Sequence, residues 1–180
     1  MDFRRSPSPL STLSINGVEV ERVTSFQFLG PTIQESLSWE PNTNFKISKA
    51  HQRLHFLQQL KKFRVSRVVM THFYRSTIES VLTFSMLVWF GHTTAQDITR
   101  MERVVRRASK IIGCSLPSLS SLFSTRIIRK AKNIIADHSH PAHYLFNLLP
   151  SGRRYRSIKT STSHFRDSTY PLAIRYLNLH

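Results

Sequence analysis

The spacing of hydrophobic residues changes near residue 41 and divides the chain into a strand-like part and a helical part. Before residue 41, apolar and polar residues alternate in LSINGVEVERV and again in TSFQFLGPTI. Alternation with period two predicts strands, and Asn16-Gly17 between two such runs is a strong signal for a β-hairpin. In the second run Phe26 and Phe28 share one face, and Gly30-Pro31 ends it. The Ser/Pro-rich residues 6–13 are typical of a loop.

After residue 41 the hydrophobic period becomes helical. A first helix is predicted over about residues 42–63, because four apolar residues recur at intervals of three and four: Ile47, Ala50, Leu54 and Leu57. Asn42 or Thr43 can cap this helix. A second helix is expected to begin after Ser66 and to run toward Trp89, with its second half apolar on nearly every side, which is typical of a buried helix.

The third predicted helix has the clearest end signals. Thr94 and Asp97 have the spacing of a capping box, with Asp in place of the favoured Glu, and Gly113 supplies a C-terminal stop. A fourth helix is predicted over about residues 119–136, and a last helical turn in PLAIRYLN. The predicted fold class is therefore α+β and mainly α, with an N-terminal β-hairpin or sheet fragment, a four-helix core and a loosely ordered basic C-terminal tail.

The distribution of charged residues changes at the same place as the hydrophobic period, near residue 41. The chain has 26 Lys and Arg against 10 Asp and Glu, and its formal net charge is +16. Residues 1–41 hold three basic and five acidic residues, whereas residues 42–180 hold 23 basic and five acidic ones, a net +18. We predict a hairpin fragment at 1–41, a basic helical domain at 42–136 and a basic tail with short helices at 137–180.

A cation excess confined to one part of a chain indicates a polyanionic partner. We predict that this partner is nucleic acid, either RNA or an RNA–DNA duplex, and we expect no small-molecule substrate. An anionic membrane surface is the alternative partner for this positive charge. It is disfavoured because no helix pairs a Lys/Arg face with the Trp/Phe-rich face of a membrane anchor.

Two of the predicted helices carry rows of Lys and Arg with almost no acidic residues between them. Residues 46–67 contain no Asp or Glu, and only Glu102 interrupts the third helix beyond its first turn. Like charges three or four residues apart repel by about 0.2–0.5 kcal/mol per pair, so such rows suggest a counter-anion; the alternative is an ordinary solvated face. Together with the basic arm GRRYR, the rows give these predicted nucleic-acid-binding residues: Lys46, Lys49, Arg53, Lys61, Lys62, Arg103, Arg106, Arg107, Lys110, Arg153, Arg154 and Arg156.

The sequence offers little for catalysis. It has five glycines and neither GxxxxGK[ST] nor GxGxxG, so no loop is built to cradle phosphates. The few acidic residues are scattered, and none is paired to hold catalytic Mg²⁺. The run DHSHPAH, residues 137–143, could bind a transition metal, but its spacing fits no named site and a solvated loop is favoured. We therefore predict no enzymatic activity, no cofactor and no metal.

The location expected from the sequence is nuclear or cytoplasmic. Cys114 is the single cysteine, so the chain has no disulfide framework. The N-terminal residues lack the apolar run of a secretory signal.

An ordered series of motifs resembles one family. DFRR, INGVEVERVTSFQFLG and LSW resemble the segment just past the catalytic palm of LINE-type (non-LTR retrotransposon) reverse transcriptases, and KISKAHQRLHFLQQLKKF and RMERVVRRASKIIG resemble the thumb that follows it. The resemblance implies that Phe26, Phe28, Leu29 and Gly30 lie at a primer grip and that the basic helices contact a template–primer duplex. Because the catalytic YxDD motif is absent, it implies a non-catalytic nucleic-acid-binding remnant, or a transposon-derived fragment without function.

A second resemblance covers about residues 47–90. This stretch is similar to the N-terminal domain of AlkB homologue 8, an alkylated-DNA-repair and tRNA-modifying protein, which implies the alternative function of an accessory RNA-docking domain. The resemblance implies no catalysis here. An AlkB-type oxygenase binds Fe(II) through an HxD pair and a distant His, and no HxD occurs in the chain. The Gly-rich turn that a methyltransferase needs is absent as well.

Overall fold

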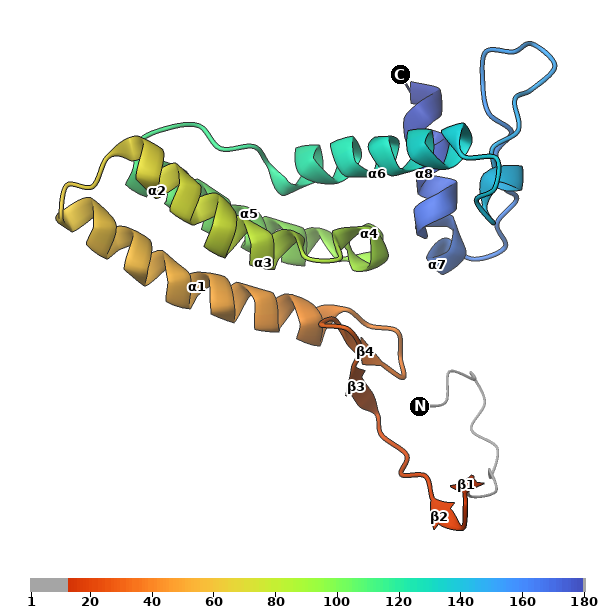
Figure 1. Ribbon diagram of the computed structural model, residues 1–180, viewed down its shortest axis with the longest axis horizontal. Coiled ribbons are helices and arrows are strands. Elements are labelled where there is room, and N and C mark those ends of the chain that lie inside the picture. The colour runs from red at the N-terminus through yellow and green to blue at the C-terminus, as the bar shows by residue number, and fades with distance from the viewer. Residues whose placement is uncertain (1–12, 180) are drawn as a thin grey trace.

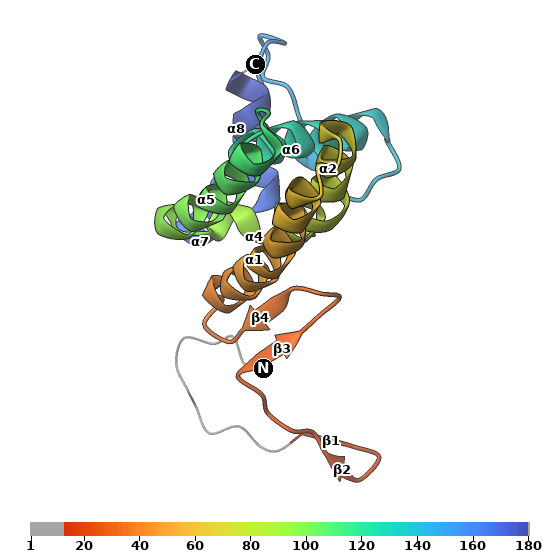
Figure 2. The ribbon, with the colours of Figure 1, turned by 90° about the vertical axis from the view of Figure 1, so that its left-hand side faces the viewer.

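The structure of the chain, a computed structural model, describes residues 13–179. The DFRR run and most of the Ser/Pro-rich stretch lie outside the described residues. The described residues form an N-terminal arm, residues 13–37, and a body of helices (Figure 1). The arm leaves the body where the first helix begins and projects away from the helices (Figure 2). The predicted fold class, α+β and mainly α, is confirmed.

The arm consists of two short antiparallel hairpins. β1 (Ser14–Ile15) pairs with β2 (Val18–Glu19) across Asn16 and Gly17, whose φ angles of 50° and 78° are those that a tight hairpin turn requires. This hairpin agrees with the sequence prediction. β3 (Ser25–Gln27) pairs with β4 (Thr32–Gln34), so the stretch predicted as a single strand is a second hairpin. Almost every side chain of the arm is exposed or half-buried.

The first helix, α1 (Glu40–Lys62), begins two residues before the predicted start. Pro41 lies in its first turn, where the fixed φ of proline favours helix initiation. The predicted caps are therefore wrong, because Asn42 and Thr43 lie inside the helix and are buried. The predicted apolar stripe is confirmed by burial of all four of its members: Ile47, Ala50, Leu54 and Leu57.

The second predicted helix is broken into several pieces. It comprises α2 (Arg67–Phe73), the π-helical turn η1 (Tyr74–Glu79), α3 (Ser80–Thr83), α4 (Met86–Trp89) and the 3₁₀ turn η2 (Phe90–His92). The Ser66 hydroxyl accepts a hydrogen bond from the Val69 N–H, as expected of a cap. Between α3 and α4, Phe84 is extended and Ser85 has a φ of 51°. The prediction of one continuous helix is therefore wrong.

The third and fourth helices follow the sequence prediction closely. In α5 (Ala95–Ile112), Thr94 Oγ1 accepts a hydrogen bond from the Asp97 N–H, and Gly113 ends the helix with a φ of 78°. The Ser118 hydroxyl caps α6 (Leu119–Ala136) by accepting from the Ser121 N–H. α5 packs along α1, and both contribute to one continuous core.

The C-terminal segment adds a further helix to this core. After the 3₁₀ turn η3 (His143–Leu145) and the short α7 (Ser163–Arg166), the helix α8 (Thr169–Leu179) packs against α6. The PLAIRYLN stretch, predicted as a turn, is thus part of an 11-residue helix. Ala173 and Ile174 are buried there, and the rings of Tyr176 and Phe123 meet edge to face. Within residues 13–179, no helix combines the length and the apolarity needed to cross a bilayer.

Candidate nucleic-acid interface

Lys46 lies inside the molecule, at the break in the second helical segment. Its Nζ donates hydrogen bonds to the carbonyl oxygens of Val81 and Phe84, both at 3.2 Å. The rings of Phe84 and Trp89 lie 5.5 and 5.1 Å from Nζ, and Trp89 Nε1 donates to the same Phe84 carbonyl. The last carbonyls of a helix have no hydrogen-bond partner within the helix. Here the buried Lys46 ammonium donates hydrogen bonds to them. The prediction that Lys46 belongs to an exposed basic row is wrong.

Two arginines serve the same broken segment. Arg53 on α1 donates through Nη1 to the carbonyl of Thr77 in the π-helical turn. Arg126 on α6 donates to the carbonyl of Thr83 at 3.0 Å. Both arginines are half-buried. Together with Lys46, they hold carbonyl groups between residues 77 and 84, so part of the basic character of α1 and α6 has a structural cause.

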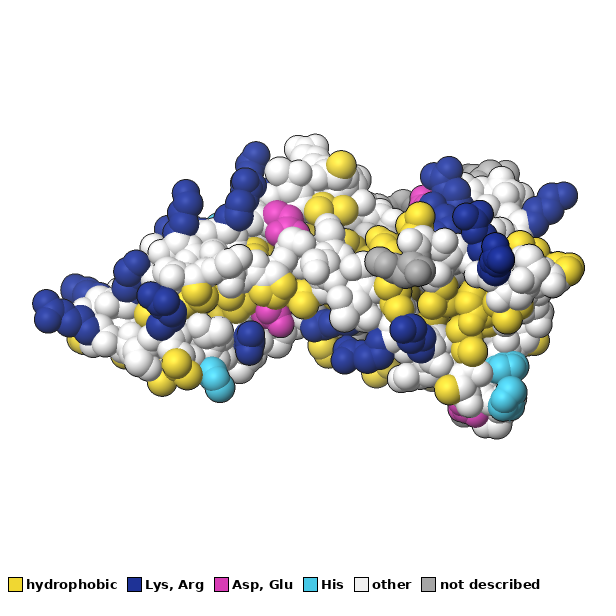
Figure 3. Space-filling view, turned by 90° about the horizontal axis from the view of Figure 1, so that it is seen from above, with side chains coloured by type: hydrophobic (Ala, Val, Ile, Leu, Met, Phe, Trp, Pro, Cys, Tyr) yellow, Lys and Arg dark blue, Asp and Glu magenta, His cyan; other side chains and the backbone are white. Residues whose placement is uncertain are grey.

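Eight of the exposed cations gather where the C-terminal ends of α1 and α5 meet the turn between α1 and α2. Lys61 Nζ lies 3.4 Å from the Lys110 carbonyl, and Thr71 Oγ1 lies 3.9 Å from Cys114 Sγ, so the three elements are adjacent. We call this surface the cationic end; its members are Lys61, Lys62, Arg64, Arg67, Arg103, Arg106, Arg107 and Lys110. Figure 3 shows Lys and Arg side chains clustered there, at the left of the view.

No member of the cationic end forms an ion pair with any acidic residue between residues 13 and 179. The C-terminal ends of α1 and α5 carry partial negative charge from the helix dipoles. Lys61, Lys62 and Lys110 lie in those last turns and offset it. The remaining five cations, all arginines, have no such local anion and face solvent. They are the ones best placed to meet an external phosphate.

A groove runs along α1 beside the cationic end. Its volume is about 550 Å³, and it is lined by residues of α1, the adjoining turn, α2 and η1: Arg53, Phe56, Gln59, Leu60, Phe63, Phe73, Ser76 and Thr77. Phe56 and Phe63 are exposed, and no acidic residue lines the groove. The sequence prediction missed both phenylalanines, although their spacing of seven residues places them on one face of a helix.

The structure does not bring the remaining predicted cations to the cationic end. Lys49 is exposed further along α1, with its Nζ 5.7 Å from the Phe45 ring. Arg153, Arg154 and Arg156 are exposed in the loop after η3, at the opposite end of the molecule (Figure 1). That loop is held by pairing of Leu148 with Tyr155. The predicted set is therefore divided: six of its residues lie at the cationic end and three in the loop after η3, Lys49 lies apart on α1, and Lys46 and Arg53 point inward.

The four primer-grip-like residues lie on the second hairpin. Phe26 is on β3, and Phe28, Leu29 and Gly30 form its turn; all four are exposed. Gly30 has a φ of 106°, and a Cβ there would come within 2.5 Å of the Phe84 ring. Glycine thus allows the turn to pack on the helix break. This contact is at the N-terminal end of α1, away from the cationic end (Figure 1).

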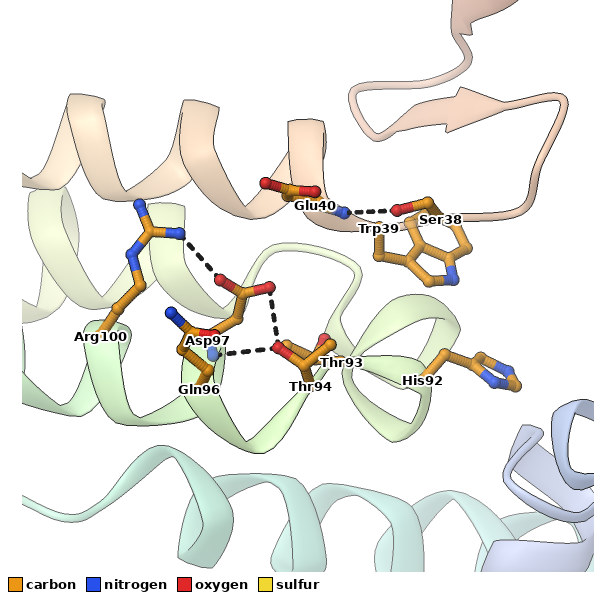
Figure 4. Close-up of a pocket in the computed structure, with 9 residues that line it drawn as sticks. All are labelled: Ser38, Trp39, Glu40, His92, Thr93, Thr94, Gln96, Asp97 and Arg100. Atoms are coloured by element: carbon orange, nitrogen blue, oxygen red, sulfur yellow. Dashed lines mark hydrogen bonds and ion pairs between the residues drawn. The ribbon is translucent and has the colours of Figure 1, made fainter.

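A polar pocket of about 250 Å³ lies where α1 and α5 begin (Figure 4). The Asp97 carboxylate points into it and is already engaged. It accepts hydrogen bonds from the Thr94 hydroxyl at 3.0 Å and from Arg100 Nη1 at 2.8 Å. The pocket therefore contains the capping network that stabilises the first turn of α5.

The histidines of residues 137–143 take part in the fold of their own loop. His140 Nδ1 accepts a hydrogen bond from the Ala142 N–H, and His143 Nδ1 lies 3.1 Å from the Ile134 carbonyl. Among residues 13–179 no group of His, Cys, Asp or Glu is arranged to hold a metal ion.

The comparison with protein families places a match on this part of the chain. Residues 39–80 match the family model described as "Alkylated DNA repair protein alkB homolog 8, N-terminal". The matched segment spans α1, α2 and η1, and so includes the α1–α2 turn of the cationic end and every residue that lines the groove. It is less than half of the chain. No curated protein and no solved structure matches the chain.

The family match confirms the predicted resemblance to the AlkB homologue 8 N-terminal domain, but residues 39–80 begin and end earlier than the predicted stretch of about residues 47–90. None of the comparisons supports the resemblance to LINE-type reverse transcriptases. That resemblance stays a prediction from the sequence motifs.

The buried ammonium gives a first testable prediction. Lys46→Met keeps an apolar side chain in the core but removes the donor for two carbonyls, so we expect the free energy of unfolding to fall by roughly 1–3 kcal/mol in urea denaturation. Lys49→Met, which changes an exposed lysine on the same helix, is the matched control and should stay within about 0.5 kcal/mol of the wild type. Equal effects of the two substitutions would contradict the structural role.

Burial also lowers the pKa of Lys46, from 10.5 to about 8. Between these two values the unfolded chain holds the Lys46 proton more tightly than the folded chain does. The free energy of unfolding of the wild type, relative to that of Lys46→Met, should therefore rise as pH increases from about 8 to 10.5 and be flat below pH 8. Urea titrations of both proteins at several pH values measure this difference in the free energy of unfolding. A difference that stays constant over this range would show that the ammonium is not buried.

Proposed function

We propose that this chain is a non-catalytic RNA-binding module that holds the phosphate backbone at the cationic end. The observation that carries the proposal is the gathering of eight exposed Lys and Arg from three adjacent elements, without an acidic partner among the described residues. Mutual repulsion at such a surface is relieved by a polyanion, whose condensed counterions are released on binding.

The arrangement of the cations suggests how the phosphate contacts are shared. Arg64 and Arg67 follow the end of α1, and Arg103, Arg106 and Arg107 line one exposed side of α5. Packed helix axes lie about 8–10 Å apart, so the two groups can contact different phosphates of one bound nucleic acid. Contacts of this kind fix position and orientation but carry no sequence information. Guanidinium groups suit them because they bind phosphate oxygens in pairs.

The family match is compatible with an accessory RNA-binding role for the chain. The family description concerns alkylated DNA repair and an AlkB homologue, and the matched segment contains part of the proposed interface. In this view, any oxygenase or methyltransferase chemistry lies outside residues 1–180. The chain itself contributes the docking surface.

The second candidate function is that of a thumb-like remnant of a reverse transcriptase. The exposure of the N-terminal arm favours this function. Phe26 and Phe28 are exposed on a two-stranded hairpin that has almost no core of its own, and isolated hairpins are only marginally stable in water. Such a hairpin is expected of a fragment from a larger sheet. A remnant of this kind would grip a template–primer duplex.

Charge removal at the two ends of the molecule tests the proposed interface. Binding to a tRNA should weaken with salt, with a slope of log affinity against log salt close to −0.7 to −0.9 for each phosphate that the protein neutralises. Replacing Arg64, Arg106 and Arg107 by Ala should weaken binding and make the slope shallower by about one for each phosphate that the variant no longer neutralises. Replacing Arg153, Arg154 and Arg156 by Ala removes the same charge at the opposite end and serves as the control. A slope near zero, or equal weakening in the two variants, would contradict the proposal.

The two candidate functions differ in their preferred ligand. An accessory module of the AlkB homologue type is expected to bind tRNA more tightly than an RNA–DNA hybrid of equal charge, whereas a thumb-like remnant should prefer the hybrid. Competition of both ligands for the wild-type chain, at one salt concentration, distinguishes them. Cofactor-dependent methylation or demethylation by the purified chain alone would show that it is an enzyme and overturn both candidates.

A further inference from the structure

We propose that the groove along α1 takes an unpaired nucleobase, so that the chain prefers single-stranded or unstacked RNA over a continuous duplex. This inference rests on the proposed function and names the form of RNA that the interface recognises. It depends on three properties of the groove: exposed aromatic walls, polar groups along its edges, and direct continuity with the cationic end.

The walls of the groove are aromatic and unusually accessible. Phe56 and Phe63 expose 58% and 75% of their surface, and Phe73 is half-buried between them and the core. Phenylalanine is normally buried, and these two exposed rings border the same groove. A volume of about 550 Å³ accommodates a planar base. Bases of single-stranded RNA stack on aromatic side chains, whereas the bases of a duplex are already stacked on each other.

The edges of the groove offer both hydrogen-bond donors and acceptors. The Ser76 hydroxyl donates to the His72 and Phe73 carbonyls, and the Thr77 hydroxyl donates to the Phe73 carbonyl. Their protons are thus used internally, which leaves oxygen lone pairs as acceptors. The Gln59 side-chain amide makes no hydrogen bond within residues 13–179, so it can donate and accept. Arg53 retains donors beyond its bond to Thr77.

The groove is continuous with the cationic end in the chain itself. Phe63 lies between Lys62 and Arg64, both of which are exposed. A base stacked on Phe63 therefore leaves its phosphate beside these two cations. A nucleotide joins a flat, partly apolar group to an anion, and this arrangement matches the groove and its rim. An apolar peptide would fill the groove but leave the cations without partners, which is why charge complementarity favours the nucleotide.

The π-helical turn contributes directly to the groove. η1 places Ser76 and Thr77 on the wall opposite α1. Turns of this kind are frequent at functional sites, and this one is stabilised by the bond from Arg53 to the Thr77 carbonyl. Arg53 thus has two roles: it supports the wall of the groove and presents its remaining N–H groups to the ligand.

Substitution of Phe63 tests the inference, because this ring is so exposed that its removal should not unfold the chain. The probes are a 12-nucleotide single-stranded RNA and the duplex that it forms with its complement, with affinities measured by fluorescence anisotropy at one salt concentration. We expect the wild type to bind the single strand more tightly. Phe63→Ala should weaken single-strand binding roughly 5- to 150-fold, the range for removal of one base–aromatic stack, and change duplex binding less than about twofold.

Two further variants make the result specific. Phe63→Trp keeps an aromatic surface and should restore single-strand affinity. Phe165→Ala removes an exposed ring from α7, at the opposite end of the molecule (Figure 1), and should have no effect. A single strand with 2-aminopurine in place of one adenine should lose fluorescence on binding to the wild type but not to Phe63→Ala, because stacking quenches the probe.

The outcomes separate this inference from the proposed function. Equal affinity of the wild type for single strand and duplex, or equal weakening of both by Phe63→Ala, overturns the inference and leaves backbone binding intact. Binding of an acidic helical peptide that is abolished in Phe63→Ala, without a single-strand preference, makes the groove a protein site and also overturns it. Failure of the wild type to bind either RNA overturns the proposed function itself.

Discussion

A buried ammonium group holds together the break in the central helical segment, and much of the structure depends on it. Lys46 supplies donors to the last carbonyls of α3, and the Phe84 and Trp89 rings enclose its charge. The Phe84 ring in turn packs against the turn of the arm at Gly30. One lysine on α1 thus fixes the end of one helix and the attachment of the arm. Hydrogen bonds and the two aromatic faces offset part of the desolvation cost of its charge, and the rest appears as its lowered pKa.

This arrangement separates two groups of cations on the helices. Lys46, Arg53 and Arg126 point inward and satisfy backbone carbonyls of the broken segment, so they need no external anion. The cations of the cationic end face solvent, and only those in the last turns of α1 and α5 have the helix ends as local partners. The net charge of the chain therefore overstates what is available for binding. The functional argument rests on the location of the remaining arginines.

The sequence was most informative where local signals determine the structure. The capping residues Thr94 and Gly113 and the Asn16-Gly17 turn act within a few residues of themselves, and the structure has them as predicted. The helix break between α3 and α4 could not be predicted from the sequence. A segment that is apolar on every side shows no helical periodicity, so a break leaves no change in the hydrophobic pattern. Lys46 was placed in the basic row although it precedes Ala50 by four residues, which puts it at the edge of the buried stripe. The cationic end could not be predicted either, because its parts on α1 and α5 are brought together by tertiary packing alone.

Chemical-shift mapping tests most directly whether the cationic end is the RNA-binding surface. In a titration of the ¹⁵N-labelled chain with a short RNA, the account predicts that the largest amide shifts fall on residues 61–67 and 103–110. The amides near Lys46 and those of residues 147–156 should change little. Shifts concentrated in residues 147–156, or spread evenly over both ends of the molecule, would contradict the account.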